Sequence, residues 1–230
     1  MQKIFIVLIL FLVPSNYLSL KGTEPITLCM DISVQCHELY HEMDLAGLVN
    51  YGAFEQAVAG YNKIQGRKKD VLTLIDFTKP STEERLFVLD MKNQKILFSS
   101  HVSHGRNSGD NYATSFSNKS GSYKSSLGFY LTENTYQGKN GYSLILNGLE
   151  KNINDKAKER AIVMHGAPYA NPSVINSSGR LGRSLGCPAL PLAVSKTIID
   201  VIKGGSLLYI YANNEDYLAQ STILPDSGNM

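Results

Sequence analysis

The sequence predicts an α+β protein in which a mainly β domain follows a short helical segment. Between residues 33 and 64, apolar side chains recur at spacings of three and four, as on one face of a helix. From residue 71 the pattern changes to short apolar runs separated by turn residues, which is typical of strands. No strand–helix–strand alternation repeats, which argues against a doubly wound parallel sheet.

Residues 1–22 have the pattern of a signal peptide or an N-terminal anchor. Lys3 precedes an apolar run from Ile4 to Val13, and Pro14 ends it. The run has the length of a signal-peptide core and is short for a bilayer span. No clear small-residue cleavage site follows, so a retained anchor and a buried helix or strand stay open as alternatives. We expect an exported mature protein without a stable membrane span.

The predicted helical segment covers residues 23–69. Glycines between residues 47 and 52 divide it into two helices, and Gly66 ends the second. The β domain is expected to cover residues 70–214, and a C-terminal tail is expected over residues 215–230. The chain has 230 residues, which is enough for one such domain with an appendage.

Seven short segments of the β domain have strand patterns, and one segment has a helical pattern. Residues 192–202 have helical spacing and end at two glycines. Residues 103–126 are rich in Ser, Gly and Asn and are longer than an inert connection, so we expect a functional loop. The expected strands are residues 71–77, 85–90, 95–98, 126–132, 142–149, 161–165 and 206–211.

Charge and cysteine content narrow the functional classes. The formal net charge is only +2, and there is no basic patch of the kind that binds nucleic acid. Cys29 and Cys36 lie close together, whereas Cys187 stands alone. In an oxidising compartment the close pair would form a disulfide and leave Cys187 as a free thiol. The alternative is that all three are inert, buried thiols.

Cys187 and His165 are the candidate nucleophile and base. His165 ends a predicted buried strand, and Cys187 follows Gly186 in a glycine-rich loop. A thiol with an ordinary pKa of about 8.5 is mostly protonated at neutral pH and needs a nearby base to become a nucleophile. Gly186 leaves the neighbouring amides uncrowded, as an oxyanion hole requires. The alternative is a buried cysteine with an unrelated histidine.

Two other chemistries are disfavoured. The string from Gly182 to Gly186 matches the nucleophile elbow of serine hydrolases, but every histidine precedes Ser184, and Pro188 occupies the place of the elbow helix. His101 and His104 have a metal-like spacing without a carboxylate at a useful distance in the sequence. We therefore expect no metal site.

The motifs around the candidate pair resemble those of a known family. His165-Gly166, followed after a loop by Ser184-x-Gly186-Cys187, resembles the catalytic motif of L,D-transpeptidases of the YkuD type. The resemblance covers about residues 70–212 and is closest to a subfamily described as murein L,D-transpeptidase catalytic domain proteins. The motifs that carry it are Phe116-Ser117-Asn118, Ser125-Ser126-Leu127-Gly128, Tyr136-x-Gly138, Asn154-Asp155 and Gly182-Arg183-Ser184-x-Gly186-Cys187-Pro188-Ala189.

This resemblance implies a β-sandwich catalytic domain with assigned site residues. The implied roles are Cys187 as nucleophile and His165 as its base, with Ser184 and Gly186 shaping the oxyanion site. The residues that we expect to bind substrate are Arg183, Gly166, Ser125 and Asn107.

The sequence departs from the main family at two places. Leu185 stands where many members have His or another polar residue, and Pro188-Ala189 stands where an apolar residue and Arg or Asn are usual. The missing Arg leaves the binding of a substrate carboxylate to Arg183, with Arg180 and Arg106 as alternatives.

The resemblance also implies a reaction and a location. The thiolate would attack the amide between an L-centre and a D-amino acid in a peptidoglycan stem peptide. The acyl group of the resulting thioester would then pass to an amine of a neighbouring stem, or to water, as in an L,D-carboxypeptidase. The implied location is the periplasm or cell envelope, and neither a metal nor an organic cofactor is required. A non-catalytic cell-wall-binding module is the alternative from a different class.

Overall fold

The strands form one mixed eight-stranded sheet. The computed structural model describes residues 24–225, with side chains from residue 33 onward. The strands are β1 (Val71–Asp76), β2 (Leu86–Asp90), β3 (Lys95–Ser100), β4 (Gly128–Gly138), β5 (Gly141–Gly148), β6 (Val163–Gly166), β7 (Ala189–Leu190) and β8 (Leu207–Tyr211). Their order is β3-β2-β1-β8-β4-β5-β6-β7. The β1–β8 and β6–β7 pairs are parallel, and the other pairs are antiparallel.

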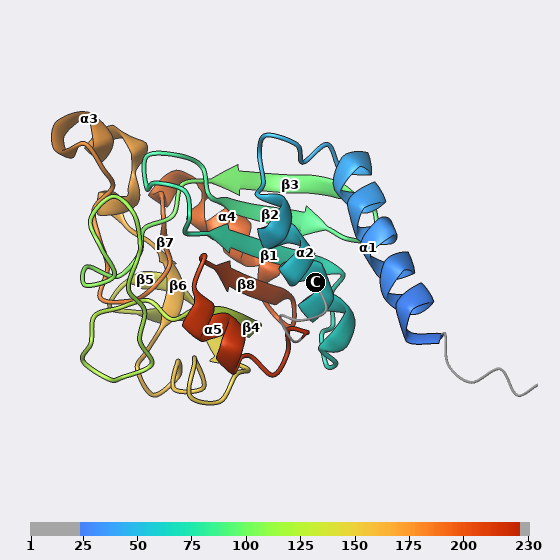
Figure 1. Cartoon of the computed structure of the whole chain (residues 1–230). Coiled ribbons are helices and arrows are strands. Elements are labelled where there is room, and N and C mark those ends of the chain that lie inside the picture. The colour runs from blue at the N-terminus through green and yellow to red at the C-terminus, as the bar shows by residue number, and fades with distance from the viewer. Residues whose placement is uncertain (1–23, 226–230) are drawn as a thin grey trace, which may run out of the picture.

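Helices cover both faces of this sheet. They are α1 (Glu24–Glu42), α2 (Tyr51–Lys63), α3 (Ile175–Ser178), α4 (Leu192–Ile202) and α5 (Glu215–Gln220), with short 3-10 turns η1 (Pro168–Ala170) and η2 (Pro172–Val174). Helix α2 packs on β1 and β8, whereas α4 packs on β5 and β6. Figure 1 shows these two helices on opposite sides of the sheet. The architecture confirms the predicted α+β class.

Helix α2 makes close contact with the sheet. The Asn50 side chain caps its start by accepting the Ala53 N–H at 3.0 Å. Gly60 faces the Phe129 ring so closely that a Cβ built at Gly60 would lie 2.1 Å from ring carbons. The absence of a side chain at Gly60 allows the helix to lie close to the strands. One hydrophobic cluster joins α1 and α2 to the sheet.

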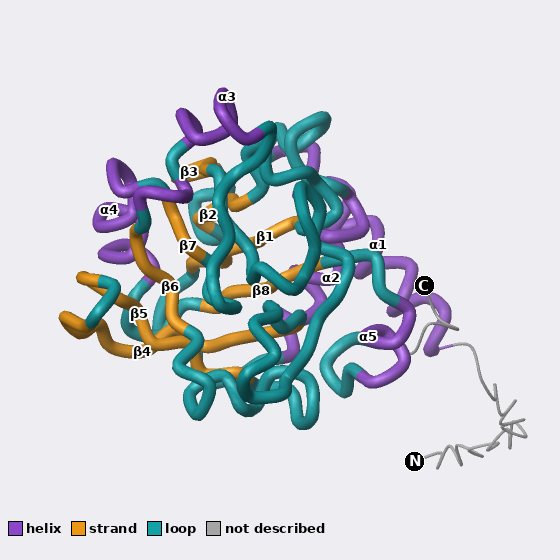
Figure 2. The backbone as a smooth tube through the Cα atoms, turned by 90° about the vertical axis from the view of Figure 1, so that its left-hand side faces the viewer, coloured by secondary structure: helices purple, strands orange, loops and turns teal. Residues whose placement is uncertain are grey.

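The sheet curves until its two edges meet. Beyond β3 the chain continues to Ser103, which forms an isolated antiparallel bridge with Ala189 of β7. The Ser103 N–H donates to the Ala189 carbonyl at 2.8 Å. Register shifts in the β2–β3 and β4–β5 pairs bend these strands. Figure 2 shows the curved sheet, in which the bridge to Ser103 brings β7 near the end of the segment that follows β3. This closure accounts for the sandwich-like shape that the resemblance implies.

A buried Arg–His pair lies beneath the point of closure. Arg85 is fully buried and donates to the Val102 carbonyl at 2.8 and 3.1 Å and to the Lys79 carbonyl at 2.9 Å. Its Nη2 also lies 2.9 Å from His104 Nδ1, which must accept because a guanidinium only donates. Burial, helped by the charge of Arg85, lowers the pKa of His104 to about 4. His104 is therefore neutral at pH 7.

The predicted helices and strands are largely confirmed, with two local differences. Residues 192–202 are helical as expected, and every expected strand is present. Ala161 is not in a strand but in a left-handed turn with φ of +53°. The expected C-terminal tail folds back in part, because α5 packs its buried Tyr217 against the domain, where the Tyr217 hydroxyl donates to Glu150 at 3.2 Å.

The expected Cys29–Cys36 disulfide is contradicted by the helix that contains both residues. Cys36 is free and buried. Both residues belong to α1, where seven residues span about 10 Å along the axis, beyond the roughly 7 Å limit between the Cα atoms of a disulfide. The side chain of Cys29 lies outside the described residues.

The proposed export segment, residues 1–22, also lies outside the described residues. Across residues 24–225, no helix combines the length and apolar character that a membrane crossing requires.

We expect the stability of the protein to fall between about pH 6.5 and pH 4 because of His104. Its folded pKa of about 4 lies below the ordinary 6.5, so the unfolded chain binds a proton that the folded protein does not. This difference removes about 3 kcal/mol of unfolding free energy as the pH falls from neutral to about 4. Urea unfolding at several pH values measures the loss.

Two Asn variants separate this effect from general acid unfolding. His104→Asn keeps an amide oxygen that can accept from Arg85 but cannot titrate, so its stability should depend less on pH. His101→Asn is the matched control, since its ring lies apart from Arg85, and it should follow the wild type. Equal pH dependence in all three proteins would contradict the assignment.

Candidate active site

The loop that carries Cys187 is held against the continuation of β3. The Ser184 N–H donates to the His104 carbonyl at 2.9 Å, and the Arg106 N–H donates to the Ser184 carbonyl at 2.8 Å. Gly105 and Ser184 form a parallel bridge. These bonds extend the contact that begins at Ser103 and Ala189, so the loop is fixed where the sheet closes.

Ser184 shapes the turn that presents Cys187. Its Oγ donates to the Cys187 carbonyl at 2.6 Å and accepts the Gly186 N–H at 3.0 Å. Gly186 has φ of +128°, and a Cβ there would lie 2.8 Å from Ile162 Cδ1 and 2.9 Å from the Lys124 carbonyl. The turn therefore requires glycine for both its dihedral angle and its surroundings. Because the Gly186 N–H already donates to Ser184 Oγ, the next N–H group along the turn is that of Cys187.

Ser125 connects the loop of residues 103–126, hereafter the polar loop, to this turn. Its side chain is buried, donates to the Gly186 carbonyl at 3.1 Å and accepts the Gly105 N–H at 3.0 Å. The Ser125 N–H donates to Ser108 Oγ at 2.9 Å. Ser125 therefore braces the loop rather than facing solvent.

The Cys187 thiol is buried beside the start of β6. Its residue is 8% exposed, and its Sγ accepts the Val163 N–H at 3.5 Å and donates to the Ala161 carbonyl at 3.6 Å. Burial raises the pKa of Cys187, while the Val163 N–H and the nearby Arg160 guanidinium act in the opposite direction. The thiol is thus protonated at rest and needs a base for its activation.

His165 lies on the strand next to Cys187. In β6 it pairs with Ser143 on one side and with Ala189, two residues after Cys187, on the other. Its Nδ1 lies 3.0 Å from the Gly166 carbonyl, so Nδ1 carries the hydrogen and Nε2 keeps its lone pair in the neutral ring. Burial lowers the pKa of His165, which favours that neutral form. Within residues 33–225, no hydrogen bond joins its ring to the thiol.

The candidate cations differ in what they contact. Asp110 binds Arg180 Nε at 2.7 Å and Arg183 Nη1 at 3.3 Å, and Arg183 Nη1 also donates to the Gly109 carbonyl. Arg106 instead lies over the Tyr123 ring, with its guanidinium carbon 4.3 Å from the ring centroid. Among the described ion pairs and hydrogen bonds, none involves the Arg106 guanidinium. Of these three cations, Arg106 is the one whose guanidinium makes no described hydrogen bond or ion pair, whereas Arg183 uses Nη1 and Arg180 uses Nε and Nη1.

The other two predicted substrate-binding residues lie at the margins of the site. A Cβ at Gly166 would lie 2.4 Å from Ser195 Oγ, so this glycine allows α4 to pack closely on β6. Asn107 is exposed, and its side chain donates to the Ser122 carbonyl at 2.9 Å. Gly166 thus faces a helix, and Asn107 pairs the two arms of the polar loop.

Two residues near the thiol, Arg160 and Tyr169, are not predicted as site residues by any sequence motif. Arg160 lies immediately before Ala161, and Tyr169 belongs to η1. Burial, followed by the influence of Cys187, raises the pKa of Tyr169 to about 12. Neither belongs to a motif, and the only available signal for Arg160 was its position just before the strand that carries His165.

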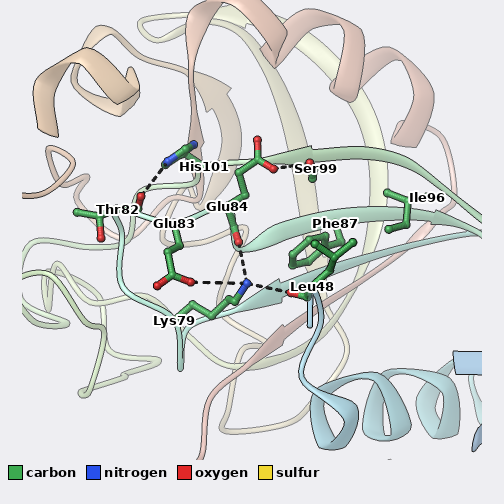
Figure 3. Close-up of a pocket in the computed structure, with 9 residues that line it drawn as sticks. All are labelled: Leu48, Lys79, Thr82, Glu83, Glu84, Phe87, Ile96, Ser99 and His101. Carbon is green, nitrogen blue, oxygen red and sulfur yellow. Dashed lines mark hydrogen bonds and ion pairs between the residues drawn. The ribbon is translucent and has the colours of Figure 1, made fainter. Parts of the chain in front are cut away.

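The two histidines of the His-x-x-His pattern face different surroundings. His101 lines a hollow of about 250 Å³, where its Nε2 contacts the Thr82 carbonyl at 3.2 Å (Figure 3). Lys79 occupies the same hollow and pairs with Glu83 at 3.8 Å. His104 points instead at Arg85. The two rings do not converge, and residues 33–225 contain no group of three or more His, Cys, Asp or Glu side chains arranged to hold a metal.

Solved L,D-transpeptidase structures resemble this chain at low identity. One from Mycobacterium smegmatis has 13% identity and a TM-score of 0.40, covering 62% of this chain and 59% of that one. L,D-transpeptidase 1 from Mycobacterium tuberculosis has 10% identity and a TM-score of 0.36, covering 62% of each chain. The Stackebrandtia nassauensis enzyme has 17% identity and a TM-score of 0.37, covering 77% and 76%. The matched part is thus under two thirds of the two mycobacterial chains.

The family of the chain follows from a match to a family model. No curated protein matches the chain. The model described as L,D-transpeptidase catalytic domain matches residues 46–211. This region begins ahead of α2, includes the whole sheet and the Cys187 loop, and makes up well over half of the chain. The chain therefore belongs to the L,D-transpeptidase catalytic domain family.

Proposed function

We propose that this protein is a cysteine acyltransferase that acts on peptidoglycan stem peptides. The observation that carries the proposal is the position of Cys187, which is held by Ser184 and Gly186 where the two sheet edges meet. In this reaction the Cys187 sulfur attacks the peptide carbonyl carbon, a C–S bond forms, and the C–N bond to the terminal D-residue breaks. An amine of a second stem then attacks the thioester and releases Cys187.

His165 is proposed to move the proton. Its neutral ring keeps a lone pair on Nε2, which suits a base that accepts the thiol proton and returns it to the leaving amine. His165 pairs with Ala189, two residues after Cys187, and the Cys187 thiol contacts Val163, two residues before His165 on the same strand, so both side chains belong to one short region of the structure. The Cys187 N–H, next to the bonded Gly186 amide, is the proposed donor to the developing oxyanion.

Arg106 is proposed to bind the carboxylate of the substrate. Its guanidinium rests on Tyr123 and has unused donors, whereas Arg183 and Arg180 share Asp110. Its backbone N–H donates to the Ser184 carbonyl, so the Arg106 main chain lies next to the turn that carries Cys187. A guanidinium binds a carboxylate through two parallel hydrogen bonds.

The proposed substrate also implies a location. Peptidoglycan lies outside the cytoplasmic membrane, so the activity requires the chain to reach the cell envelope. Lys3 and the apolar run that follows it support export by their signal-like pattern.

Replacement of Cys187 by Ala should abolish the activity. Without the sulfur no thioester forms, and we expect turnover of disaccharide-tetrapeptides to fall by at least about 10³-fold. Product analysis by mass spectrometry measures cross-linked dimers and tripeptides. Cys36→Ala is the matched control, because Cys36 is also free and buried but lies on α1, and it should retain activity.

The products also distinguish the two outcomes of the thioester. Dimers indicate transfer to an amine, and tripeptide without dimers indicates the L,D-carboxypeptidase reaction. Full turnover by Cys187→Ala would refute the mechanism. A non-catalytic wall-binding role would instead leave the biological phenotype of Cys187→Ala intact.

Arg106→Met should raise KM for a stem peptide with a free C-terminal carboxylate by about 10-fold or more, because a charge-assisted hydrogen bond is lost. Steady-state kinetics on free and C-terminally amidated peptides measures the effect. The amidated peptide should be used equally by wild type and variant. If Arg183→Met instead raises KM and Arg106→Met does not, the carboxylate belongs to Arg183.

A further inference from the structure

Arg160 is a cation beside the thiol to which the proposed reaction assigns no role. Its guanidinium is half-buried and donates to the Ser117 carbonyl at 2.7 Å and to the Lys124 carbonyl at 2.6 Å. It also contacts the hydroxyls of Ser126 and Ser122. All four acceptors are neutral, and no described ion pair includes Arg160. Its positive charge is therefore held in place without a compensating carboxylate.

The guanidinium and the thiol are positioned by the same two short segments. A Cβ built at Gly186, the residue before Cys187, would lie 3.5 Å from Arg160 Nη2. On the other side, Ala161 follows Arg160 and accepts from the Cys187 Sγ at 3.6 Å. The cation is thus adjacent to the turn that presents the nucleophile.

A strained backbone maintains this arrangement. Ala161 has φ of +53°, which costs a non-glycine residue about 1–2 kcal/mol. The Ala161 N–H donates to the Lys158 carbonyl and the Ile162 N–H to the Ala157 carbonyl, as at a helix end that stops at a left-handed residue. This turn directs the Ala161 carbonyl to the sulfur while the Arg160 side chain reaches back to the polar loop. Backbone strain of this kind persists where surrounding contacts enforce it, frequently at functional sites.

We propose that Arg160 is a positioning residue that stabilises the Cys187 thiolate through its fixed positive charge while holding the polar loop beside Gly186. When the thiol proton leaves, the new negative charge lies in a poorly solvated site, where a nearby cation lowers its energy. The other titratable groups around the thiol are His165 on β6 and Tyr169 on η1, neither of which supplies a permanent positive charge. The catalytic meaning of this role rests on the proposed function, but the thiol can be tested without substrate.

The direction of the Cys187 pKa shifts agrees with this role. Burial is the largest influence and raises the pKa of the thiol, and Arg160 lowers it. Conversely, burial lowers the pKa of Arg160, and the interactions with Tyr130 and, after it, Cys187 raise it.

The test is the pH dependence of Cys187 alkylation by iodoacetamide in the full chain, followed by mass spectrometry of the Cys187 peptide. Arg160→Met should raise the midpoint pH by about 1 unit, as expected for the loss of a neighbouring cation that is partly screened. Arg160→Lys keeps the charge but cannot satisfy four acceptors, so its midpoint should stay within about 0.3 unit of the wild type. Lys158→Met, which removes an exposed cation of the same turn that pairs with Glu133, is the matched control and should not shift it.

Thermal unfolding separates the electrostatic effect of Arg160 on the thiol from its contribution to the stability of the fold. Both Arg160 variants should lower the Tm, because both lose hydrogen bonds to the polar loop. Equal midpoint shifts in the Met and Lys variants, or no shift in Arg160→Met, would overturn the electrostatic role. If Arg160→Met does not fold, Arg160→Lys decides: an unchanged midpoint with a lowered Tm supports the role, and a rise of about 1 unit refutes it. Because no stem peptide is used, a failure of the proposed reaction does not affect the result.

Discussion

The structure of the site depends on the pairing of Ser103 with Ala189 at the two edges of the sheet. Once these edges meet, the chain after β3 runs alongside the loop before β7, and bonds from His104 and Arg106 to Ser184 follow. The closure thus pairs β7 with the segment that follows β3 and also gives the loop that carries Cys187 a rigid support. A loop of this composition would otherwise be mobile, since glycine and serine restrict the backbone little.

Two guanidinium groups lie near the closure, that of Arg85 fully buried and that of Arg160 half-buried. Arg85 beneath the loop is satisfied by carbonyls and by the neutral ring of His104. Arg160 on the other side is satisfied by carbonyls and hydroxyls. Neither guanidinium makes an ion pair among the described residues, but the buried Asp76 acts electrostatically on Arg85. The hydrogen-bond acceptors of Arg160 are all neutral, so its charge favours an anion nearby, such as a thiolate.

The sequence predicted most elements because their hydrophobic periods are clear, as in α4 and in the β2–β3 hairpin. It also singled out Cys187, Ser184 and Gly186, which the structure brings together in one turn. What it could not predict depends on long-range packing. Strand β7 has only two residues and no period of its own. The pairing of Arg183 with Asp110, and the place of Arg160, follow from loop geometry that no local pattern encodes.

The closure has a consequence for the order of folding. The contacting segments, 103–106 and 184–189, are separated in sequence by β4, β5 and β6, so their pairing requires that most of the sheet is already built. Before that moment Cys187 is an ordinary cysteine in a flexible chain, without the turn, the neighbouring amide or the cation. The proposed site is therefore assembled late, and a nascent or partly unfolded molecule lacks the turn that it requires.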